Sequence, residues 1–353
     1  MRLLRERMGS RAAPHLDATG RRTAEKRMPP AGAEPKLTGK GAETEGQEAR
    51  PLVSVVIPAY NASRTIIKTI ASAQNQIFDN IEIIVINDGS TDNTLDLLKD
   101  LARSEPRLHI ISQDNSGVAA ARNAGIHKAR GKYIAPLDAD DIWLPEHIEQ
   151  QVQLLELHPR KPGLSFGLSD RTDENGRVIQ RARGVAFVGP ATRQLASGNP
   201  IGNGSAAVFR RDLAMEIGGY DTTLRARGGE GVEDWKFCFE MSIICEFSCT
   251  GSTSVHYADL PKSMSKNYLI MFKSSSLAIK ESMNKRECYK RRLEIRLDKL
   301  AIIYSIKCIK NRNLTDAIQI VRNASENRAA TFFLFVPISI FELSAAKLIS
   351  FAR

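Results

Sequence analysis

The sequence predicts an α/β protein with a mostly parallel sheet flanked by helices, followed by a helical C-terminal part. Between residues 52 and 144, short apolar runs rich in β-branched residues alternate with segments of helical spacing. This alternation is typical of parallel sheets whose strands are connected by helices. Several of the apolar runs end in polar residues, and ligands bind at the carboxyl ends of strands in such sheets. We divide the chain into residues 1–50, 51–260 and 261–353.

Charge is spread unevenly over these three parts. Lys and Arg number 11 against 7 Asp and Glu in residues 1–50, 21 against 26 in 51–259, and 18 against 7 in 260–353. The basic C-terminal part indicates either an anionic partner, such as an acidic membrane surface, or solvated faces of basic helices. No nucleic-acid-binding motif accompanies it, so we expect no nucleic acid partner. Five cysteines without paired spacing indicate reduced thiols in the cytoplasm.

Both ends of the chain differ in composition from its middle. Residues 1–50 are basic, lack hydrophobic periodicity and contain no apolar signal segment, which predicts disorder. The apolar stretch 331–343 contains Pro337 and Glu342 and is shorter than the roughly 20 residues of a membrane span. It predicts a helix packed on the body or a helix lying at a membrane interface. We therefore expect a cytoplasmic protein, with peripheral association at the cytoplasmic face of a membrane.

The first half of the middle part predicts four strands, because each is an apolar and largely β-branched run. The strands are expected at 53–58, 81–86, 108–111 and 132–136. Helices are expected after them at 61–74, 91–102, 117–129 and 145–157. Asn61 to Ser63 are suitable caps for the first helix, and Pro145 suits the first turn of the last one.

The second half of the middle part is less regular, and its pattern predicts shorter elements. Strands are expected at 164–168, 178–180, 204–209 and 247–256, and helices at 212–217 and 233–244. In the C-terminal part, one amphipathic helix has apolar residues every three or four positions, with Lys and Arg opposite. The apolar positions are Leu293, Leu297, Leu300, Tyr304 and Cys308.

Three carboxylates stand within four residues directly after the fourth strand. They belong to Asp138, Asp140 and Asp141. Clustered carboxylates repel one another unless a cation lies among them, and oxygen ligands suit Mg²⁺ or Mn²⁺. The alternative is an acidic turn that caps the next helix. Because Asp88 and Asn115 also follow strand ends, the fold is expected to bring them to the same edge as Asp138.

Four motifs in one order give the chain a resemblance to a known family. They are Ile57–Asn61, Asn87–Asp92, Asn115–Asn123 and Asp138–Asp141. With them, residues 52–260 resemble a family 2 glycosyltransferase of the Rossmann-like GT-A fold. The resemblance implies inverting transfer from a nucleoside-diphosphate sugar, most often a UDP-sugar, with Mn²⁺ or Mg²⁺. It implies a saccharide or lipid-linked saccharide acceptor, in cell-surface polysaccharide or glycolipid biosynthesis.

The resemblance also implies the residues that bind the donor. Pro58 would flank the nucleobase, Tyr60 would stack on it, and Asp88 would accept a hydrogen bond from it. Arg122 would reach the nucleotide or its phosphates, whose oxygens match the guanidinium fork. The structural alternatives are an aromatic at the edge of the core for Tyr60, a turn-closing carboxylate for Asp88, and pairing of Arg122 with Asp88 or Asp138.

Within the acidic cluster, the resemblance assigns the metal to Asp140. Asp138 would lie near the ribose or the metal, whereas Asp141 would turn away or cap the helix.

The expected general base follows a Gly-rich loop, 228–231. Glu233 and Asp234 open the helix after this loop, in the place of the family's Glu-Asp motif. We expect Asp234 to take the proton from the acceptor hydroxyl, with Glu233 as the second candidate. The alternative is a purely structural pair of acids at a helix start.

Two other classes of protein share some of these features. A sugar nucleotidyltransferase usually has a Gly-rich, basic loop after its first strand, and Pro58-Ala59-Tyr60-Asn61 is not such a loop. A non-catalytic protein that binds nucleotide sugars or polyanions would not need Asp234.

Overall fold

The computed structural model describes residues 52–260 and 263–325. Its strands are β1 (Val53–Ala59), β2 (Ile81–Asp88), β3 (Leu108–Gln113), β4 (Tyr133–Pro136), β5 (Ile142–Trp143), β6 (Leu164–Thr172), β7 (Val178–Gln180), β8 (Phe187–Gly189), β9 (Ala207–Arg210) and β10 (Phe247–Ala258). Its α-helices are α1 (Ile66–Gln74), α2 (Thr94–Ala102), α3 (Val118–Lys128), α4 (His147–Leu157), α5 (Thr192–Ser197), α6 (Arg211–Glu216), α7 (Thr223–Ala226), α8 (Glu233–Ile244), α9 (Tyr268–Lys285), α10 (Lys290–Lys310) and α11 (Leu314–Ser325).

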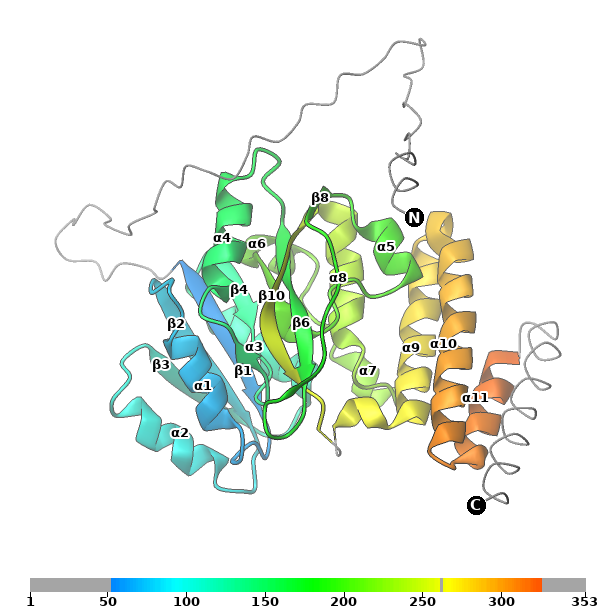
Figure 1. Cartoon of the computed structure of the whole chain (residues 1–353), viewed down its shortest axis with the longest axis horizontal. Helices are drawn as coiled ribbons and strands as arrows, with labels where there is room; N and C mark the ends of the chain where they lie inside the picture. Colours follow the sequence, from blue (N-terminus) through cyan, green and yellow to red (C-terminus); the bar gives the residue numbers. More distant parts are fainter. Residues whose placement is uncertain (1–51, 261–262, 326–353) are drawn as a thin grey trace, which may run out of the picture. The chain divides into compact units, whose positions relative to one another are not determined.

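The strands of the described residues form one mixed sheet in the order β3-β2-β1-β4-β9-β6-β10-β5 (Figure 1). Strands β1 to β4 pair in parallel, as does β10 with β6. Strand β9 is antiparallel to both β4 and β6. The predicted fold class, a mostly parallel sheet flanked by helices, is confirmed. The parallel strands place the ends of β1, β2 and β4 at one edge.

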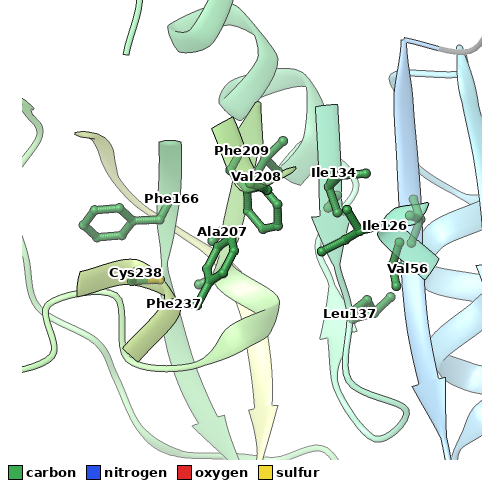
Figure 2. Packing of buried hydrophobic residues seen from close by; sticks show 14 of the residues in the cluster. Val56, Ile126, Ile134, Leu137, Phe166, Ala207, Val208, Phe209, Phe237 and Cys238 are labelled. Carbon is green, nitrogen blue, oxygen red and sulfur yellow. The ribbon is translucent and has the colours of Figure 1, made fainter. Parts of the chain in front are cut away.

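The sheet is buried between the covering helices because its central strands are apolar on both faces. Figure 2 shows Val56 of β1, Ile134 of β4 and Ile126 of α3 among these buried side chains. Gly125 permits the close approach of α3, since a Cβ there would lie 2.3 Å from Cγ1 of Val56. The helix that carries Arg122 is therefore fixed against the first strand.

The C-terminal helices share this core. Ala278 and Ile279 of α9 and Leu293 of α10 belong to the same buried cluster as the sheet. A smaller cluster joins α9, α10 and α11 through Phe272, Ala301, Cys308, Ala317 and Ile320. None of the helices within the described residues is long and apolar enough to cross a bilayer. The predictions for residues 1–50 and for 331–343 lie outside the described part of the chain.

The first helix begins later than predicted. Helix α1 starts at Ile66, and the expected caps bind the loop after β2 instead. Asn61 has a φ of 50°, and its Oδ1 accepts a hydrogen bond from the backbone N–H of Thr91 at 2.8 Å. The Ser63 N–H donates to Oδ2 of Asp92 at 3.1 Å. These bonds hold the loops after β1 and β2 together.

Candidate functional site

Tyr60 lies at the end of β1, beside the loop after β2 to which its neighbour Asn61 is bonded. Its side chain is 52% exposed, so the alternative of a core-edge aromatic does not describe it. Pro58 lies within β1, partly buried and in register with Ile86 of β2. An exposed ring at a strand end offers a flat surface for a nucleobase. The donor-binding roles of Pro58 and Tyr60 stay predictions.

Asp88 is buried at the end of β2 and organises the loop before α3. Its carboxylate accepts hydrogen bonds from Nε2 of Gln113 (2.7 Å) and from the N–H groups of Ser116 (2.9 Å) and Gly117 (2.9 Å). The turn after Asp88 is closed by Asn87, whose Oδ1 accepts from the Ser90 N–H at 3.3 Å. The alternative of Asp88 as the turn-closing residue is therefore wrong, and its contact with a nucleobase stays a prediction.

Arg122 of α3 is a buried bridge between two acids that are distant in sequence. Its Nη2 donates to Oδ1 of Asp138 at 2.5 Å, and its Nη1 donates to Oε1 of Glu233 at 2.8 Å. Although burial lowers it, the charges of these two acids raise the pKa of Arg122 well above its usual range. Of the alternatives, pairing with Asp138 is the arrangement found. The bridge joins the end of β4 to the start of α8.

The acidic cluster divides into two carboxylates at the site and one that is part of the scaffold. Asp141 is fully buried and turns away, as predicted. Its Oδ2 accepts from Oγ of Ser205 at 2.6 Å, and its Oδ1 accepts from the N–H of Ala258 at 2.9 Å. Asp138 and Asp140 remain as the acids that can reach a ligand.

The two remaining carboxylates fit a divalent cation. Burial and the charge of Asp138 raise the pKa of Asp140 to about 6, so the pair is electrostatically strained when both are ionised. Mg²⁺ is usually held by one or two protein carboxylates together with substrate phosphates. In the described part of the chain, no three or more His, Cys, Asp and Glu side chains gather as a metal site. Further ligands would therefore come from the donor diphosphate and water.

Asp234 and Glu233 have different surroundings although they are adjacent. Both carboxylate oxygens of Glu233 have hydrogen-bond donors within the chain. Oε1 accepts from Arg122, and Oε2 accepts from the N–H of Gly231 at 3.0 Å. Oδ1 of Asp234 accepts from the Trp235 N–H at 2.6 Å. Burial and the charge of Glu233 raise the pKa of Asp234 to about 7, which suits a general base. The geometry favours Asp234 over Glu233, and the assignment stays a prediction.

Three residues near the site were not predicted from the sequence. A Cβ on Gly204 would lie 3.0 Å from Nη2 of Arg122, so glycine leaves room for the bridge. Oγ of Ser205 accepts from the N–H of Asp138 at 3.0 Å. Arg296 of α10 lies over the ring of Trp235. No motif marks these residues, because only the tertiary fold brings them to the acids.

A comparison with models of protein families finds one that matches this chain. Residues 54–218 match the model of glycosyl transferase family 2, a range that includes the loops of Tyr60, Asp88, Arg122 and Asp138. Residues 54–218 are thus similar to glycosyltransferase family 2. The resemblance seen in the four motifs is thereby confirmed. Residues 219–353, with Asp234, lie beyond the matched range.

Curated relatives match this chain over part of its length. An uncharacterized glycosyltransferase of Rickettsia bellii is 36% identical over 168 residues, which is 46% of this chain and 24% of that protein. Chondroitin synthase of Pasteurella multocida is 46% identical over 99 residues, 28% of this chain and 10% of that protein. The putative teichuronic acid biosynthesis glycosyltransferase TuaG of Bacillus subtilis is 39% identical over 107 residues, 30% of this chain and 42% of that protein. The matches thus span less than half the length of these relatives.

Solved structures confirm the GT-A fold of this chain. Residues 1–349 of S. aureus TarS, solved with UDP-GlcNAc, align with a TM-score of 0.57 and 16% identity, over 76% of this chain and 79% of that one. The mannosyltransferase PcManGT of Pyrobaculum calidifontis, solved with GDP-Man and Mn²⁺, aligns with a TM-score of 0.54 and 18% identity, over 85% and 80%. At these identities the likeness concerns the fold.

Proposed function

We propose that this chain transfers a sugar from a nucleoside-diphosphate sugar, in first place a UDP-sugar, to an acceptor hydroxyl with inversion. The acceptor would be a saccharide or a lipid-linked saccharide in the biosynthesis of a cell-surface polysaccharide or glycolipid. Relatives support this class, since they include chondroitin synthase and the putative teichuronic acid biosynthesis glycosyltransferase TuaG. TarS with UDP-GlcNAc and PcManGT with GDP-Man support the donor class.

The observation that carries the proposal is the bridge made by Arg122. It joins Asp138, one member of the acid pair, to Glu233, which is adjacent to Asp234 in the sequence. A displacement at an anomeric carbon needs a stabilised leaving group on one side and a base for the nucleophile on the other. The bridge holds residues suited to both tasks at one site.

The reaction would be a single displacement. The acceptor oxygen forms a bond to the anomeric carbon while the bond from that carbon to the diphosphate oxygen breaks. Asp234 takes the acceptor proton, a contribution that is typically 10²–10⁴-fold in rate. Glu233 stays paired with Arg122 and keeps the first turn of α8 in place. The nucleobase would bind beside Tyr60, Asp88 and the loop before α3.

Asp138 and Asp140 would hold a divalent metal ion, Mn²⁺ or Mg²⁺. When bound, such an ion neutralises the negative charge that develops on a diphosphate leaving group. PcManGT, solved with Mn²⁺, supports metal use by this chain.

The first test is transfer from a panel of UDP-, GDP- and dTDP-sugars with Mn²⁺. We expect one donor class to support transfer, with a product of inverted anomeric configuration.

Asp234→Asn should lower kcat by about 10²–10⁴-fold and leave donor binding intact. Asp140→Ala should weaken metal-dependent donor binding as well. Asp96→Asn, an exposed aspartate on α2, is the matched control. Wild-type transfer by both site variants would refute these roles, and donor hydrolysis without transfer would favour a different activity.

We also propose that the protein associates peripherally with the anionic cytoplasmic face of a membrane. The outward face of α10 supports this, because apolar and basic side chains alternate along it at helical spacing. The exposed residues are Arg292, Ile295, Lys299, Ile303, Ile306 and Lys310. Each basic residue near an anionic surface contributes about 1 kcal/mol of attraction.

Vesicle binding tests this surface. We expect binding to vesicles with anionic lipid, weaker binding at high salt, and little binding to vesicles of phosphatidylcholine alone. Lys299→Gln with Ile303→Gln should weaken it severalfold. Ile67→Gln, an exposed isoleucine on α1, is the control. Equal binding to neutral and anionic vesicles would contradict the proposal.

A further inference from the structure

Arg296 is a buried cation that the proposed chemistry does not yet use. It lies on α10, outside the range that matches the family, and is 8% exposed, whereas its neighbour Ile295 faces solvent. Its side chain is directed toward the start of α8 and the end of α5, which α10 contacts. Arg296 thus connects the C-terminal helices to the start of α8, which carries Asp234.

The guanidinium joins two segments that face each other. Its carbon lies 4.2 Å from the centre of the Trp235 ring. Its Nη1 donates to the carbonyl of Leu195 at 2.5 Å and also to the carbonyl of Gly198. Nε1 of Trp235 donates to the same Leu195 carbonyl at 3.0 Å. The guanidinium of Arg296, the indole of Trp235 and the carbonyl of Leu195 therefore each contact the other two.

This arrangement is a costly way to stabilise a fold. Within residues 52–260 and 263–325, no carboxylate forms an ion pair with Arg296, and its buried Nε has no hydrogen-bond partner. Burial lowers the pKa of Arg296 to about 10, which reflects the cost of its charge. Because an apolar residue would avoid that cost, the arrangement points to a role other than stability.

Two short routes lead from Arg296 to the reacting groups. Trp235 directly follows Asp234 and donates its N–H to Oδ1 of that residue. Gly198 opens the segment that runs to Ser205, whose Oγ accepts from the N–H of Asp138. Arg296 thus contacts both the start of α8, which carries Asp234, and the segment that supports Asp138.

We propose that Arg296 is a positioning residue that sets the placement of Asp234 relative to the acid pair Asp138 and Asp140. It does so by clamping Trp235 against the 195–198 segment. This inference rests on the proposed transferase function. Lysine cannot replace it, because an ammonium has no planar group that stacks on the indole while its nitrogen, like Nη1 of Arg296, bonds both carbonyls.

The test compares Arg296→Met and Arg296→Lys with Arg291→Met, which removes the same charge from an exposed position of the same helix. A misplacement of about 1 Å can cost roughly 10²-fold in rate. We expect both Arg296 variants to lose about that much kcat, with donor KM and UDP affinity within about twofold of wild type. Arg291→Met should transfer at the wild-type rate. Wild-type kcat in Arg296→Met or Arg296→Lys would overturn the proposal.

A second variant separates positioning from folding. Trp235→Phe keeps an aromatic ring and removes the Nε1 bond to Leu195. If both residues act through one clamp, the double variant with Arg296→Met should be no slower than the slower single variant. Multiplied losses would overturn the proposal, as would loss of the cooperative thermal transition in both Arg296 variants. A wild-type chain that transfers no sugar would instead overturn the proposed function.

Discussion

Two adjacent carboxylates at the start of α8 have become chemically different through their bonds. Glu233 accepts from Arg122 and from the Gly231 N–H, which keeps it in place. Asp234 is desolvated beside the charge of Glu233, and these effects raise its pKa. A carboxylate whose pKa is raised toward the working pH is suited to act as a general base. Asp234 is the residue whose proton affinity suits the transfer.

This difference predicts the pH dependence of transfer. The base acts as the carboxylate, and a raised pKa means that the inactive, protonated form persists up to a higher pH. With a pKa of about 7 for Asp234, kcat/KM should fall tenfold per pH unit below about pH 7. The profile should be measured at saturating metal, because Asp140 also has a raised pKa.

The control for this profile is UDP affinity, measured over the same pH range at saturating metal, which should change little. An acidic limb near pH 4, the ordinary range of an aspartate, would contradict the assignment of Asp234.

At the scale of elements, α10 belongs to the core of the catalytic unit. Leu293 on its inner face is fully buried in the same cluster as the sheet, whereas Ile303 on its outer face is 47% exposed. A helix that shares a core with the sheet should unfold together with it. The larger buried cluster thus includes residues on both sides of residue 260, where the second and third parts of the chain meet.

Leu293→Ala should therefore destabilise the whole unit by about 2–5 kcal/mol, the usual range for removing a buried leucine side chain. Denaturant unfolding followed by circular dichroism and by activity should show one transition, shifted to lower denaturant by both probes. Ile303→Ala should change the stability by about 0.5 kcal/mol or less. A shift in only one of the two probes would indicate that α10 unfolds separately.

The elements differ in how well the local sequence predicts them. Strands β1, β2 and β4 were predicted because each is a buried apolar run that needs no information from elsewhere. Strands β5 and β8 were not predicted, since they have two and three residues and exist through pairing with β10. The short helices α5 and α7 likewise depend on tertiary contacts more than on propensity.

At the scale of the whole molecule, the sequence predicted which acids lie at the strand ends, whereas their ion-pair partners depend on the tertiary structure. Asp88, Asn115 and Asp138 were expected at one edge because each follows a strand end. The sequence could not choose between the partners of Arg122, since ion pairing depends on distances that only the tertiary structure sets. Arg296 carried no signal, because a basic residue on a basic amphipathic helix is ordinarily solvated.

The bridge made by Arg122 has a consequence for how substrates meet this site. Its bonds to Asp138 and Glu233 are internal to the chain, so the two halves of the site are pre-organised before any donor arrives. A rigid, ready-made site does not need to spend binding energy on ordering its own side chains. Affinity gained from distant parts of the donor or acceptor can then be used to bring the reacting atoms together.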